Sequence, residues 1–62
     1  MIELTYQIPN EADRHHPEFV DVSASNVPRV GDRIARDGFE YDVATVLWRS
    51  LLCDSALVIL NV

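Results

Sequence analysis

The chain has 62 residues, with ten acidic side chains against five basic ones and a formal net charge of −5. This length permits one small domain, residues 1–62, and a hydrophobic content of 48% is typical of a globular chain. The negative charge argues against a broad nucleic-acid-binding surface, which requires clustered lysine and arginine. A membrane-spanning helix is excluded as well, because it needs about 20 consecutive apolar residues.

Two stretches in the first half of the chain alternate between apolar and polar residues, which predicts half-buried β-strands. Residues 1–8 place four apolar side chains on one face: Ile2, Leu4, Tyr6 and Ile8. Residues 18–24 place Val20, Val22 and Ala24 on one face and Phe19 on the other. Pro9 and Asn10 end the first strand.

The polar segment between these strands, residues 11–17, contains both histidines of the chain. A weak site for a divalent ion could use its carboxylates and imidazoles, namely Glu11, Asp13, His15 and His16. The spacing lacks the pattern of specific metal sites, so we expect a solvated loop that holds no metal and no cofactor.

Residues 27–48 predict two strands joined by a tight turn. Asp37-Gly38 is a strong hairpin signal, because a two-residue turn of this kind needs positive φ at its central positions. The second strand changes its alternation at Ala44-Thr45, which predicts a β-bulge that returns Val46 to the apolar face. The alternative is a central strand that is covered on both faces and needs no bulge.

The last part of the chain is apolar at most positions. Leu51-Leu52-Cys53 would close one end of a barrel or form a short helical turn, with Cys53 as a small buried residue and not a nucleophile. Residues 56–62 predict a strand that must be covered on both faces. Leu57 and Ile59 would face water unless another subunit or the N-terminal region covers them.

The turn and core residues of residues 28–48 resemble small SH3-like β-barrels of bacteria and bacteriophages. The resemblance is carried by Pro28-x-x-Gly31-Asp32-x-Ile34, then Asp37-Gly38, then Tyr41-x-Val43-x-x-Val46-x-Trp48. It covers about a third of the chain and implies an all-β fold: a small five-stranded SH3-like barrel or a strongly twisted antiparallel sheet. The resemblance assigns no functional residues to this chain, since a fold does not define a function.

A domain this small usually needs an additional source of stability, such as a disulfide, a metal or a partner. Cys53 is the single cysteine, so an intramolecular disulfide is excluded. We therefore expect a homo-oligomer, with Leu57 and Ile59 at its interface. A single unpaired cysteine and an N-terminus without signal-peptide features predict a cytoplasmic protein.

No catalytic motif is present, so we expect a protein that is not an enzyme. The leading hypothesis is a protein-binding module, such as a phage or mobile-element inhibitor whose acidic surface docks on a basic patch of a host protein. Its binding residues would be Trp48, Tyr41, Phe19 and Arg49, because Trp, Tyr and Arg dominate interface energies. For Trp48 and Tyr41, a place in the barrel core is the competing interpretation.

The alternative hypothesis is a homo-oligomer that binds a small molecule or nucleotide in an interface pocket. All five basic residues are arginines, whose planar guanidinium can donate two parallel hydrogen bonds to a phosphate or a carboxylate. Arg33, Arg36 or Arg49 would hold the phosphate in this case, and an aromatic ring would stack on the base.

Overall fold

The computed structural model describes residues 1–10 and 15–62, and these form five β-strands and no helix. The strands are β1 (Ile2–Ile8), β2 (Glu18–Ala24), β3 (Arg33–Arg36), β4 (Phe39–Trp48) and β5 (Ser55–Asn61). The predicted all-β fold with five strands is confirmed, and the bounds of β1, β2 and β5 differ from the expected ones by one residue at most. Within the described ranges no helix is long and apolar enough to span a bilayer.

The strands form one mixed sheet in the order β2-β1-β5-β4-β3. Three of its pairings are antiparallel, and β1 pairs with β5 in parallel, which the expectation of a purely antiparallel sheet did not include. A parallel pair needs a long crossover connection, and here β2, β3 and β4 with their loops supply it.

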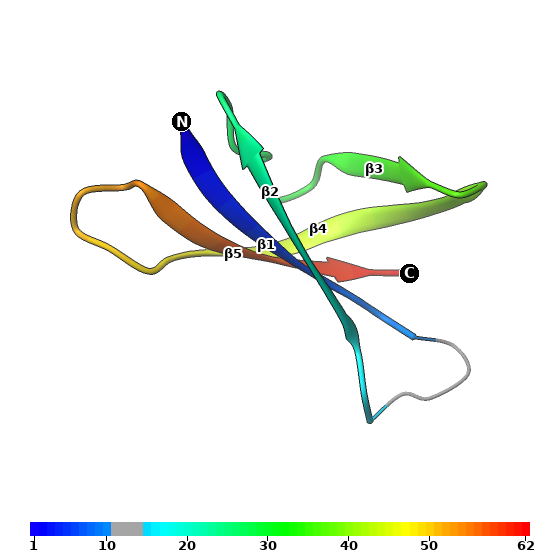
Figure 1. Cartoon of the computed structure of the whole chain (residues 1–62). Coiled ribbons are helices and arrows are strands. Elements are labelled where there is room, and N and C mark those ends of the chain that lie inside the picture. The colour runs from blue at the N-terminus through cyan, green and yellow to red at the C-terminus, as the bar shows by residue number, and fades with distance from the viewer. Residues whose placement is uncertain (11–14) are drawn as a thin grey trace.

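The sheet curls strongly into a half-barrel that is open between its two edge strands, β2 and β3 (Figure 1). No Cα atom of β2 lies within 8 Å of a Cα atom of β3, whereas paired strands lie about 4.8 Å apart. The half-barrel therefore has a wall of five strands and one open side.

The core lies on the inner face of this curl, where alternate residues of β1, β4 and β5 meet. Its buried members are Leu4, Ile8, Val43, Ala56, Val58 and Leu60. Side chains of the edge strands, including Val20 of β2 and Ile34 of β3, pack against this cluster. β5 supplies three of the six buried residues because it is the central strand of the sheet.

The β3–β4 hairpin has the predicted turn and the predicted bulge. Asp37 and Gly38 both have positive φ, at 52° and 83°. The register between β4 and β5 shifts between Val43 and Thr45, and Val46 returns to the face that packs on the core. The interpretation of β4 as a strand without a bulge is therefore wrong.

Of the two alternatives for the segment after Trp48, the closing of a barrel end is wrong, and the chain forms a single turn at Leu51-Leu52. Leu51, Leu52 and Cys53 are all exposed and form a hairpin loop that closes no end of the barrel (Figure 1). The expectation that Cys53 is buried is wrong, because the loop between β4 and β5 extends past the sheet, where no strand covers it.

Candidate functional site

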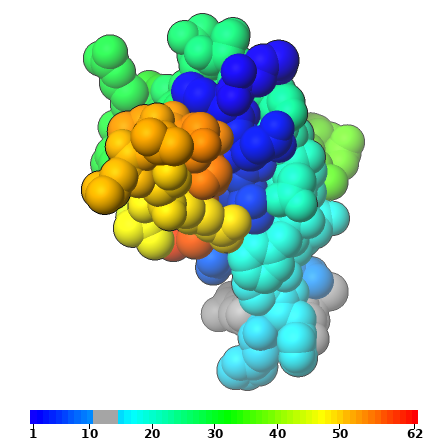
Figure 2. Space-filling view, turned by 60° about the vertical axis from the view of Figure 1, so that its left-hand side comes forward, coloured from blue at the N-terminus to red at the C-terminus, as the bar shows by residue number. Residues whose placement is uncertain are grey.

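Trp48 and the loop that follows it expose three large apolar side chains. These are Trp48, Leu51 and Leu52, and we call them the apolar end. Leu51 is fully exposed, Leu52 is 82% exposed and Trp48 is 41% exposed. In Figure 2 the β4–β5 loop, in gold and orange, projects toward the viewer.

Hydrogen bonds hold the loop of the apolar end in shape. The Arg49 amide donates to the Ser55 carbonyl at 2.9 Å, which closes the hairpin below the loop. Ser50 then accepts twice, from the Leu52 amide on its Oγ at 3.1 Å and from the Cys53 amide on its carbonyl at 3.1 Å. These bonds direct both leucines outward, away from the core.

A groove of about 370 Å³ lies beside Trp48 at the same end. It is lined by Val27, Pro28, Arg29, Val30, Val46 and Trp48. The turn that forms its far wall is fixed by Asp32, whose carboxylate accepts from the Arg29 amide at 2.8 Å. Gly31, at φ 95°, adds a hydrogen bond from its amide to the Val43 carbonyl at 3.0 Å.

The outer face of the sheet is mixed in character. Phe19 is 58% exposed there, while Leu57 and Ile59 are half-buried between the neighbouring strands, with no second layer over them in the described part of the chain. Arg49 also lies on this face: its Nη1 approaches Thr5 Oγ1 at 3.4 Å, and Thr5 donates to Asp21 at 2.7 Å. The predicted oligomer-interface residues are thus placed on one face.

A cleft of about 500 Å³ lies at the opposite end of the molecule and brings Arg36 together with two aromatic rings, Phe39 and Tyr41. Arg36 donates through both terminal nitrogens to the carboxylate of Glu18, which also lines the cleft. These hydrogen bonds lower the pKa of Glu18 and raise the pKa of Arg36. The cation in this cleft is therefore already partnered by an anion.

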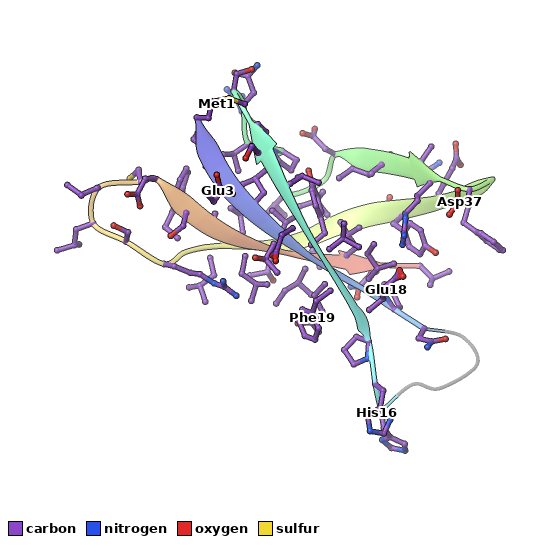
Figure 3. All side chains as sticks on the ribbon, viewed as in Figure 1. Met1, Glu3, His16, Glu18, Phe19 and Asp37 are labelled. Atoms are coloured by element: carbon purple, nitrogen blue, oxygen red, sulfur yellow. The ribbon has the colours of Figure 1, made fainter. Side chains whose placement is uncertain are left out.

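A narrower apolar slot of about 260 Å³ opens between β2 and β3. It is lined by Tyr6, Ile8, Val20, Val22, Ile34, Ala35, Arg36 and Leu60. Burial at its floor raises the pKa of the Tyr6 hydroxyl. Figure 3 shows that Glu18 projects from β2 toward the side of the β3–β4 hairpin, whereas Phe19 projects the other way.

The structure does not bring the predicted binding residues into one site. Trp48 lies at the apolar end, Tyr41 and Arg36 in the cleft at the opposite end, and Phe19 and Arg49 on the outer face. Arg33 is exposed and lies 3.2 Å from Asp42 and 3.6 Å from Glu40. Exposed ion pairs contribute little to stability, so we assign the ion pairs of Arg33 no role in a binding site.

The binding residues predicted from the sequence did not include two residues of the apolar end, namely Leu51 and Leu52. The signal that could have found the leucines is their position in a hairpin connection, between Ser50 and Asp54. Loops run over the surface, so a large apolar pair within one is expected to be exposed.

The described residues contain no group of three histidine, cysteine or carboxylate side chains that could hold a metal ion. His15 and His16 are exposed, and the two carboxylates considered with them, Glu11 and Asp13, lie outside the described residues. No protein-family model, curated protein or solved structure matches the chain.

Proposed function

We propose that this chain is a non-enzymatic binding module that docks on another protein through its apolar end. The observation that carries the proposal is the pair Leu51-Leu52, held exposed on a hydrogen-bonded loop beside Trp48. An isolated exposed leucine is ordinary on a protein surface, but a gathered apolar patch marks an interaction site.

The shape of the apolar end suits a protein partner. A projecting loop with two leucines can enter a pocket, and burying each leucine side chain is worth about 1.5–3 kcal/mol. The groove beside Trp48 can in turn accept a side chain from the partner. Tryptophan is enriched among the residues that dominate binding energy, and here it lies between the two features.

The charge of the chain indicates the kind of partner. At a net charge of −5, the molecule is attracted to a surface with a basic rim around an apolar pocket. An inhibitor that occupies a basic patch of a host protein would fit this charge.

Replacing Leu51 and Leu52 by aspartate is expected to weaken partner binding by at least about 100-fold, since the apolar burial of two side chains is lost. Thermal stability should stay the same, because both side chains are exposed. The partner is first identified by a photo-crosslinking side chain at position 51, and its affinity for each variant is then measured by calorimetry.

Phe39→Asp is the matched control, because Phe39 is 56% exposed but lies in the cleft at the opposite end. It should bind the partner as the unchanged protein does. Equal affinity of the unchanged protein and the Leu51→Asp/Leu52→Asp variant for the crosslinked partner would contradict the proposal.

A second candidate function is the binding of a nucleotide in the cleft of Arg36, Phe39 and Tyr41, since this cleft places a guanidinium beside two rings that could stack on a base. Phosphate would have to displace Glu18 from Arg36. Titration with ATP, followed by backbone amide shifts, should then move the signals of residues 36–41 and lose that response in Arg36→Gln. No shift at millimolar ATP would exclude this function.

A further inference from the structure

The two edge strands of the half-barrel face each other without pairing. β2 has seven residues and β3 has four, and no Cα atoms of the two strands lie within 8 Å of each other. Edge strands of this kind present backbone N–H and C=O groups that can pair with another chain. The apolar slot opens between them, with Val20 and Val22 on one wall and Ile34 on the other.

The charges of these edges are segregated by sign. β2 carries the acidic Glu18 and Asp21 and no basic residue. β3 carries the basic Arg33 and Arg36 and no acidic residue. Arg36 and Glu18 already pair across the slot, which shows that this strand combination is compatible in charge.

We propose that two copies of the chain associate edge to edge, with β2 of each copy pairing with β3 of the other, so that two half-barrels close each other. Glu18 then pairs with Arg36 of the partner subunit, and the partner's Glu18 pairs with Arg36. This surface is separate from the apolar end, so the inference does not depend on the proposed function.

Strand direction agrees with this arrangement. β1 runs parallel to β5 and antiparallel to β2, while β5 and β3 are both antiparallel to β4. β2 and β3 therefore run in opposite directions. Rotation about a two-fold axis along the barrel leaves the direction of each strand unchanged. Each pairing of β2 with β3 of the other copy is therefore antiparallel. The two pairings are equivalent, as the symmetry of a two-fold dimer requires.

The exchange costs little and gains new contacts. The ion pair of Glu18 and Arg36 is broken within each copy and formed again between copies, so the number of these pairs does not change. Exchanging identical contacts between copies therefore costs little free energy. Backbone groups of both edges become paired, and the apolar slot is closed. A second copy complements both edges at once, because its basic β3 lies against the acidic β2 and its acidic β2 lies against the basic β3.

The test uses charge reversal and mixing. The unchanged protein should be a dimer by sedimentation equilibrium, while Glu18→Arg alone and Arg36→Glu alone should each dissociate at least tenfold more readily. An equimolar mixture of the two variants should form heterodimers, because both contacts in the mixed pair again join opposite charges. A pair formed only within one chain cannot be restored by mixing.

Control variants distinguish this β2–β3 interface from an interface at the apolar end or on the outer face. The double variant Glu18→Arg/Arg36→Glu should dimerise as the unchanged protein does, and so should Leu51→Asp at the apolar end. The milder variants Glu18→Gln and Arg36→Gln give a second series if a reversal fails to fold. A monomeric unchanged protein, or a mixture that stays monomeric, would overturn the proposal. Dissociation by Leu57→Lys or Ile59→Lys, but not by the charge variants, would assign the interface to the outer face instead.

Discussion

Replacing Leu4 by alanine is expected to lower the free energy of unfolding by about 2–4 kcal/mol, the largest effect of any single change proposed for this protein. Leu4 is only 1% exposed and belongs to a core of six buried residues. A domain of this size rarely has more than about 3–5 kcal/mol of net stability. The variant should therefore be partly unfolded in the absence of denaturant.

Urea denaturation followed by circular dichroism measures this effect. Leu51→Ala is the matched control, because it makes the same chemical change at a fully exposed position and should leave the unfolding midpoint where it is. If the two variants lost similar stability, Leu4 would not lie in a packed core and the inner face would have to be reassigned.

Replacing Gly38 by valine should destabilise the β3–β4 hairpin by about 1–3 kcal/mol, because a β-branched residue is forced into a left-handed conformation. Gly38 has φ 83°, and an added Cβ would meet no atom within 4 Å. The cost is thus backbone strain and not a steric clash with a neighbour. The melting temperature should fall accordingly.

Two further substitutions isolate the role of φ. Gly38→Asn should lose less than Gly38→Val, since asparagine tolerates the left-handed region. Glu40→Val places valine at an exposed strand position two residues away and should be tolerated. Equal losses in Gly38→Val and Glu40→Val would argue that the turn does not depend on positive φ.

Features set by neighbouring residues were predictable from the sequence. Asp37-Gly38 identifies the turn because few other residue pairs accept positive φ at both positions. The bulge was visible because Val43 and Val46 are three residues apart on one face, which the period of two in a strand cannot produce. Each of these signals lies within a few residues of the feature that it predicts.

Features that depend on distant parts of the chain were not predictable. The parallel pairing of β1 with β5 joins residues more than 50 positions apart, and the apolar pattern of neither strand indicates the direction in which it pairs. The exposure of Leu51 and Leu52 follows from the pairing of β4 with β5, which makes residues 49–54 a hairpin connection. The two leucines do not by themselves show that pairing.

The candidate site illustrates the same limit. Trp48 was identified by its residue type, but its neighbours Val27, Pro28 and Val30 come from a loop that the curl of the sheet brings beside it. Arg36 was proposed as a phosphate ligand, and its partner Glu18 lies on the opposite edge of the sheet. A single sequence does not show such pairings.

The central place of β5 has a consequence for how the chain acquires its fold. β5 is the furthest along the sequence of the five strands, yet it joins β1-β2 to the β3–β4 hairpin and supplies half of the buried core. During synthesis, the two earlier hairpins can form separately, but they have no surface in common until β5 is made. The sheet of this protein is therefore completed only when β5 is present, and loop-closure entropy across the residues between β1 and β5 slows that step.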